Sequence, residues 1–124
     1  MKLFLMLGSI SGFLSVALGA FGAHALKARL DEYSLGVFQT GVTYQTTHAL
    51  AIILVALLLK WYPDASGLNW AGWCFAIGTL IFSGSLYTLA MSGIKTFGAI
   101  TPIGGVLFLI GWALLAVHAW KIVS

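Results

Sequence analysis

The chain has 124 residues, of which 60% are hydrophobic and only 7% are charged, and its mean hydropathy is +1.03. A soluble domain carries about 25% charged residues, so this sequence cannot solvate a globular surface and is typical of one integral membrane domain covering residues 1–124. The formal net charge of +3 comes from scattered side chains without a basic run, which leaves nucleic-acid binding without support.

The first predicted span covers residues 3–23. Its start is similar to a signal peptide, but its apolar part is longer than the roughly 7–15 residues of a signal core, so we expect a retained span. Small residues recur in it at steps of three and four and therefore share one face: Gly8, Gly12, Ser15 and Gly19. Such patterns allow close helix packing in lipid, either within the chain or across a symmetry axis.

The segment after this span, residues 24–35, concentrates charge. Its charged residues are Lys27, Arg29, Asp31 and Glu32. Because Leu26, Leu30 and Tyr33 follow at helical spacing, we predict a short amphipathic helix at the membrane interface, within residues 25–35. The alternative is a solvated loop.

The second span is too short unless it includes polar residues. Its strictly apolar part, residues 49–59, is far below the length of about 20 residues that a spanning helix needs. Extension back to residue 38 gives a span of 38–60 and places His48 about 15 Å into the helix, near the bilayer midplane. Gly41, Tyr44, Gln45 and His48 then share one face of this helix.

Two further spans are predicted at residues 70–91 and 99–119, with Thr101 and Pro102 suited to a helix start. The expected fold is therefore an all-α, up-and-down bundle of four transmembrane helices, with Gly104 and Gly105 as packing residues of the last one. Both termini then lie on one side, beside an aromatic belt of Trp61, Trp70, Trp73 and Trp120. The basic residues are nearly balanced between the two sides, and we place the termini in the cytoplasm.

This topology brings polar residues from four segments to the half of the membrane opposite the termini. They are His24, Tyr44, Gln45, His48, Ser83, Ser85, Tyr87 and Thr101. Polar side chains in hydrocarbon cost free energy unless they are paired, so we expect Gln45 and His48 to face inward, toward Tyr87 and the start of the fourth span. The cluster is either interhelical hydrogen bonding, a site in which His48 titrates or binds a ligand or ion, or an interface with another protein.

Catalytic and metal-binding patterns are missing from the sequence. The acidic residues Asp31, Glu32 and Asp64 lie near water, so no Ser–His–Asp set can form. The two histidines of the cluster, His24 and His48, have no carboxylate nearby and are too few for zinc. The single Cys74 lies in an apolar run, where we expect a small core residue. We predict no enzyme, no metal and no cofactor.

Several motifs resemble a known family of small membrane proteins. They are "GAFGAHAL" at Gly19–Leu26, "QTGVTYQTTHALAI" at Gln39–Ile52, "FSGSLY" at Phe82–Tyr87 and "ITPIGGVLFLIGW" at Ile100–Trp112. The family is the domain of unknown function 423, with a eukaryotic relative called transmembrane protein 256. The resemblance covers nearly the whole chain and implies a four-helix protein of a bacterial inner membrane, without an established activity.

Two functions remain open at this point. The cluster around His48 binds or conducts a small solute, proton or ion, or the chain is an accessory or assembly subunit of a larger membrane complex and the cluster is structural. A water-filled cavity lined by Gln45 and His48 would favour the first function, and a dry, packed region would count against it. Because the small-residue faces permit close approach, we also expect the chain to form a homo-oligomer in the lipid bilayer.

Overall fold

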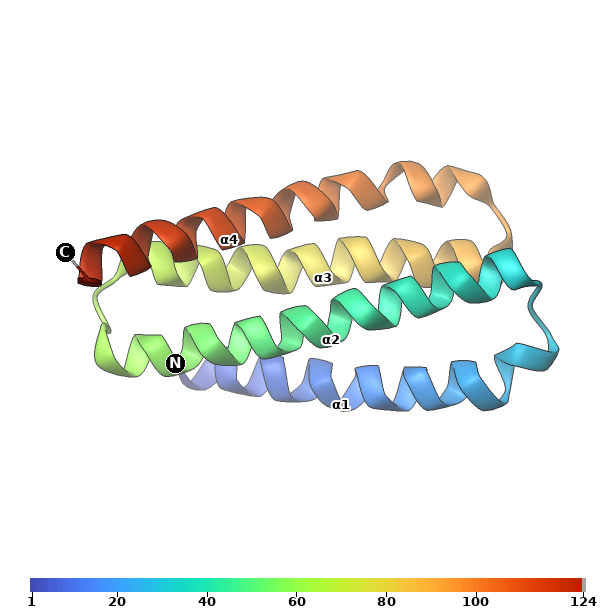
Figure 1. Ribbon diagram of the computed structural model, residues 1–124, viewed down its shortest axis with the longest axis horizontal. Coiled ribbons are helices and arrows are strands. Elements are labelled where there is room, and N and C mark those ends of the chain that lie inside the picture. The colour runs from blue at the N-terminus through green and yellow to red at the C-terminus, as the bar shows by residue number, and fades with distance from the viewer. Residues whose placement is uncertain (124) are drawn as a thin grey trace.

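The computed structural model describes residues 1–123, and within this range the chain forms four long α-helices and no strand (Figure 1). The helices are α1 (Lys2–His24), α2 (Glu32–Trp61), α3 (Ser66–Ser92) and α4 (Thr101–Val123). Two 3-10 helices, η1 (Leu26–Ala28) and η2 (Lys95–Ala99), lie in the connections at one end. All four long helices are long and apolar enough to cross a membrane, which confirms the predicted all-α fold of four spans.

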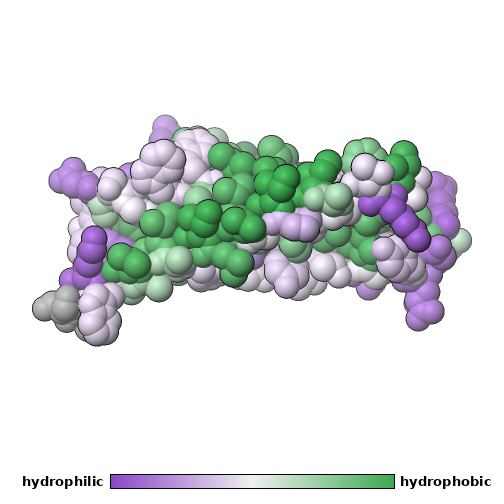
Figure 2. All heavy atoms as spheres, turned by 90° about the horizontal axis from the view of Figure 1, so that it is seen from above, coloured by the Kyte–Doolittle hydropathy of each residue, from purple (hydrophilic) through white to green (hydrophobic). Residues whose placement is uncertain are grey.

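The helices lie in chain order, each antiparallel to the one before it, and the two termini are at the same end (Figure 1). The inner helices are α2 and α3, in whose most apolar stretches 44% and 33% of the residues are buried, against 17% in α1 and in α4. The outer helices expose apolar side chains such as Phe13 and Leu109. In the face shown in Figure 2, hydrophobic residues cover the middle and hydrophilic residues gather at both ends, as expected for a surface that contacts lipid.

The connection between α1 and α2 differs from the prediction. The short helix expected within residues 25–35 is only the single turn η1, held by the buried Leu26, and α2 begins already at Glu32. The reason is a helix cap, because Asp31 Oδ1 accepts a hydrogen bond of 2.7 Å from the backbone N–H of Ser34. The hydrogen bonds with Ser34 also lower the pKa of the Asp31 carboxyl.

Aromatic rings of one helix pack directly on glycines of another. In the described part of the chain there are five such pairs: Gly22 with Phe38, Gly41 with Tyr87, Gly72 with Phe4, Gly78 with Phe108, and Gly111 with Phe75. In each pair a Cβ atom at the glycine would lie only 2.6–2.9 Å from a ring carbon. Only glycine therefore permits this distance between the helices, and lipid supplies no hydrophobic drive that could replace the contact.

The small-residue face of α1 packs against α2. A Cβ atom at Gly8 would lie 2.9 Å from the carbonyl oxygen of Ala49, and one at Gly19 would lie 3.4 Å from Val42. Gly12 faces Ala49 at a looser 3.9 Å, and the hydroxyl of the buried Ser15 donates to the Gly12 carbonyl. This face, from which we expected self-association, is thus occupied within the chain.

Two neighbouring glycines of α4 allow the close packing to be tested. A Cβ atom at Gly104 would lie 2.5 Å from the backbone nitrogen of Phe82, whereas one at Gly105 would come no closer than 3.8 Å to the Phe82 ring. Gly104→Ala should therefore force α3 and α4 apart and lower the free energy of unfolding by about 1–3 kcal/mol relative to Gly105→Ala, the usual cost of overpacking. Unfolding in detergent micelles, followed by circular dichroism, measures this difference, and equal stability of the two variants would contradict it.

Candidate functional site

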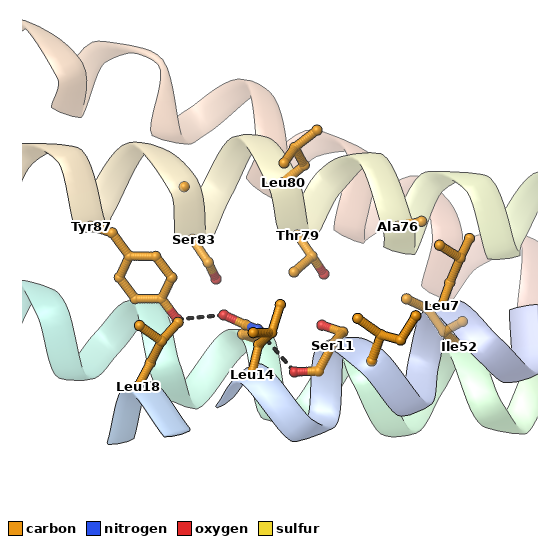
Figure 3. Close-up of a pocket in the computed structure, with 13 residues that line it drawn as sticks. Leu7, Ser11, Leu14, Leu18, Ile52, Ala76, Thr79, Leu80, Ser83 and Tyr87 are labelled. Atoms are coloured by element: carbon orange, nitrogen blue, oxygen red, sulfur yellow. Dashed lines mark hydrogen bonds between the residues drawn. The ribbon is translucent and has the colours of Figure 1, made fainter. Parts of the chain in front are cut away.

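A groove of about 330 Å³ opens between α1, α2 and α3 in the middle of the molecule (Figure 3). Most of the residues that line it are apolar: Leu7, Ile10, Leu14, Leu18, Ile52, Ala76, Leu80 and Gly84. The polar ones are Ser11, Gln45, Thr79, Ser83 and Tyr87. The groove is thus a mainly apolar cleft with polar groups from three helices.

Gln45 lines the groove and joins these three helices. Its amide nitrogen donates to the backbone carbonyl of Ser11 in α1 at 2.9 Å, and its amide oxygen accepts from the Tyr87 hydroxyl in α3 at 2.6 Å (Figure 3, dashed lines). The side chain is only 6% exposed. Because a glutamine amide carries two N–H groups, one N–H of Gln45 is left without a partner among the described residues.

The glycine Gly41 brings α2 and α3 together at this position. The Tyr87 ring lies directly over Gly41, and the Ser83 hydroxyl donates to the Gly41 carbonyl at 2.7 Å. Thr79, one turn away on α3, bonds back to the carbonyl of Phe75 in its own helix. The position of Tyr87, and with it the hydrogen bond to Gln45, therefore depends on glycine at position 41, where any side chain would displace the ring.

His48 lies in a different environment, between α2, α3 and α4. Its Nδ1 is 2.8 Å from the Tyr44 carbonyl, and its Nε2 accepts a hydrogen bond of 3.0 Å from the indole N–H of Trp112. Because an indole nitrogen can only donate, Nε2 carries no proton, and a neutral His48 donates from Nδ1 to Tyr44. Both ring nitrogens are therefore engaged.

Aromatic rings enclose the His48 imidazole, which is 3% exposed. It stacks on Phe108 with 3.6 Å between ring centroids and an interplanar angle of 9°. Phe75 and Trp112 lie at 5.6 and 5.8 Å, and the ring of Tyr44 stacks at 6.1 Å. These rings leave His48 in a packed aromatic cluster, and His48 does not line the groove.

The structure divides the polar cluster that the sequence predicted. Gln45, Ser83 and Tyr87 meet at the groove, whereas His48 and the half-exposed Tyr44 belong to the aromatic cluster. Ser85 and Thr101 form a separate pair of hydroxyls at 2.6 Å between α3 and α4. His24 is the last residue of α1 and is exposed, so the structure does not bring it to either group.

The predicted partners of His48 were wrong. It faces neither Tyr87 nor the start of α4 but Trp112, which lies in the middle of that helix. A signal for Trp112 exists in the sequence, since an indole N–H far from the interfacial belt needs a hydrogen-bond partner. Ser11, the second missed residue, acts through its backbone carbonyl, and no side-chain pattern reveals that role.

Comparisons with known proteins place the chain in a family. The family model described as protein of unknown function, DUF423, matches residues 18–105. The chain belongs to this family. Similar proteins include the UPF0382 membrane protein YwdK of Bacillus subtilis, which is 45% identical over 98% of both chains, and the UPF0382 membrane protein SH2409 of Staphylococcus haemolyticus, which is 43% identical over the full length of both. No solved structure matches the chain.

The DUF423 match includes most residues of the groove and of the aromatic cluster around His48. It includes all of α2 and α3 and therefore Gln45, His48, Ser83 and Tyr87. It ends before Trp112, and it begins after Ser11. Relatives of this DUF423 protein that extend over its full length are named membrane proteins of bacteria, and the chain is an integral membrane protein.

The arrangement of His48 predicts its tautomer. Nuclear magnetic resonance of the protein with ¹⁵N-labelled histidine, in micelles, should show His48 neutral with a proton on Nδ1 and none on Nε2. Trp112→Phe should leave the proton on Nδ1, because the Tyr44 carbonyl still accepts from it, but should shift the Nε2 resonance, because Nε2 loses its hydrogen-bond donor. The exposed His24 provides a control in the same spectrum. A proton on Nε2 of His48 in the unmodified protein would contradict the assignment.

Because Gln45 and Tyr87 are hydrogen-bonded, mutations of the two residues should have non-additive effects on the free energy of unfolding. In a double-mutant cycle of Gln45→Leu and Tyr87→Phe, we expect a coupling free energy of about 0.6–1.7 kcal/mol, the range measured for hydrogen bonds between transmembrane helices. Tyr33→Phe is the control, because Tyr33 is exposed at the start of α2 and its effect should add to that of Gln45→Leu. Additive effects of Gln45→Leu and Tyr87→Phe would show that the bond is absent.

Proposed function

We propose that this protein binds a small, mainly apolar molecule that enters the groove between α1, α2 and α3 from the bilayer. The observation that supports the proposal is the combination of apolar walls with a buried amide, Gln45, that has an unused N–H. The volume of about 330 Å³ falls at the lower end of the range of about 300–1,000 Å³ that is usual for small-molecule pockets.

The chemistry of the groove defines the kind of ligand. Side chains such as Leu14 and Leu80 form its walls, and they favour a hydrocarbon chain or ring. The free N–H of Gln45 can donate to a carbonyl, ether or hydroxyl oxygen of the ligand. In a region that excludes water such a bond has little competition, so a single oxygen at the right depth would select among apolar molecules.

Binding is better supported than conduction. A conducting role would use His48, but both of its ring nitrogens are engaged and its ring is stacked in the aromatic cluster. The groove itself offers an amide and hydroxyls. In the described part of the chain no group of three or more His, Cys, Asp or Glu residues could hold a metal ion there. We therefore propose binding and not conduction.

Photolabelling tests the proposal directly. The protein is placed in lipid nanodiscs with a long-chain alcohol that carries a diazirine, and the labelled residues are mapped by peptide mass spectrometry. We expect label on the groove residues Leu14 and Leu80 well above that on Leu109 of α4, which is 70% exposed and therefore about as accessible from the bilayer as Leu80 at 75%. We expect unlabelled alcohol to compete with this label. Equal, non-competed labelling of all apolar surfaces would refute a binding site.

A variant that fills the groove tests the same site. Gly84 lines the groove, and a Cβ atom there would have no neighbour within 4 Å, so Gly84→Leu can add a side chain at the groove without a clash at its Cβ. It should lower labelling of Leu14 and Leu80 by roughly tenfold, equivalent to about 1.4 kcal/mol of binding free energy. Ala17→Leu adds the same side chain on the exposed face of α1 and should leave the labelling unchanged.

A further inference from the structure

We propose that the ligand of the groove is an anionic phospholipid, with one acyl chain in the groove and its phosphate beside Lys60 and Asn69. The inference rests on the proposed function, because it names the ligand class of the same groove. It is carried by a second pocket at the end of the molecule where the termini lie, and by the alignment of this pocket with the groove.

The second pocket is formed where α2 ends and α3 begins. It has a volume of about 310 Å³ and is lined by Met1, Leu59, Lys60, Pro63 and Asn69. Its polar side chains are the Lys60 ammonium and the Asn69 amide, and both can donate hydrogen bonds. The ammonium lies over the Trp61 ring at 5.8 Å from its centroid, which places the charge at the aromatic belt, where lipid headgroups lie.

Groove and second pocket lie along one seam between the helices. Residues at steps of seven line them: Gln45, Ile52 and Leu59 on α2, and Asn69, Ala76 and Ser83 on α3. Seven residues are nearly two full helical turns, so the members of each set share one face of their helix. The seam therefore runs from the middle of the molecule to the end that carries the termini.

Phe4 fills the seam between the groove and the second pocket. Its ring lies on Gly72, 5.4 Å from the ring of Trp73, and the residue is only 3% exposed. A chain that joins pocket and groove therefore passes over Phe4 and not beneath it. Along this path Trp73, which contacts Phe4 and is 41% exposed, presents an apolar ring, as a hydrocarbon chain requires.

The length of the seam fits one lipid leaflet. Asn69 and Ser83 are fourteen residues apart on one helix, which corresponds to about 21 Å at a rise of about 1.5 Å per residue. Half of a bilayer that measures about 40–45 Å with its headgroups is the same distance. A lipid with its phosphate at Lys60 would therefore bring the end of its acyl chain to Gln45.

The charge at this end of the molecule favours an anion. Lys2 and Lys60 lie at the helix ends on this side, with one carboxylate, Asp64, in the connection between α2 and α3. The first residue of α3 follows Ala65, which provides no side-chain cap, so the N–H groups and the positive end of that helix also face this region. A phosphate group would satisfy both features, whereas a zwitterionic headgroup would bring a second cation toward Lys60.

Native mass spectrometry of the delipidated full-length protein in a neutral detergent tests the inference. The protein is titrated with phosphatidylglycerol and with phosphatidylcholine of identical acyl chains. We expect phosphatidylglycerol to bind roughly tenfold more tightly, as expected for a charge-assisted hydrogen bond. Lys60→Gln should remove this preference and Lys60→Arg should retain it. Lys95→Gln, which removes an exposed lysine at the opposite end, should leave it unchanged.

The outcomes separate this inference from the proposed function. If Lys60→Gln and Lys95→Gln have the same effect on the preference, the phosphate site is refuted. If Gly84→Leu nevertheless abolishes binding of both lipids, the groove keeps its binding role for an apolar chain, without selecting the headgroup. If Gly84→Leu changes the binding of neither lipid, both proposals fail. Displacement of the lipid by millimolar inorganic phosphate would show a free-phosphate site and overturn the assignment to a phospholipid.

Discussion

The contact of an aromatic ring with a glycine sets the distance between the helices, and the other interactions depend on it. Lipid tails are as apolar as the side chains they surround, so helix association relies on close packing. Gly22, Gly41 and Gly78 each receive a ring from the next helix. Such contacts join α1 to α2, α2 to α3, and α3 to α4. At this spacing, side chains as short as serine can bond to a neighbouring backbone, as Ser83 does.

The two buried polar side chains of α2 form hydrogen bonds with different helices. Gln45 reaches Ser11 of α1 and Tyr87 of α3, whereas His48, less than one turn later, reaches Trp112 of α4. Together they connect α2 to every other helix of the chain. This explains how a helix with polar side chains near the bilayer midplane is tolerated, because both side chains have hydrogen-bond partners in the protein and, within residues 1–123, only one N–H of Gln45 is left without one.

The fold was predictable from the sequence, and the division of the polar residues was not. Lengths of apolar segments determine the number of spans, since a bilayer has a fixed thickness. The rotation of each helix about its axis depends on which ring packs on which glycine, and a pattern of small residues does not show this. Gln45 and His48 therefore looked like one site. The early start of α2 could have been recognised, since Asp31 is a typical N-cap residue.

The arrangement in chain order has a consequence for biosynthesis. Each helix packs mainly on its neighbours in the sequence, so α2, α3 and α4 each meet a main partner that is already in the membrane when they leave the ribosome. Contacts of this local kind form quickly and need no rearrangement of earlier segments. The groove is complete as soon as α3 is inserted, because α1, α2 and α3 alone line it. Insertion of α4 then adds Trp112 and Phe108, and the imidazole of His48 receives its partners last.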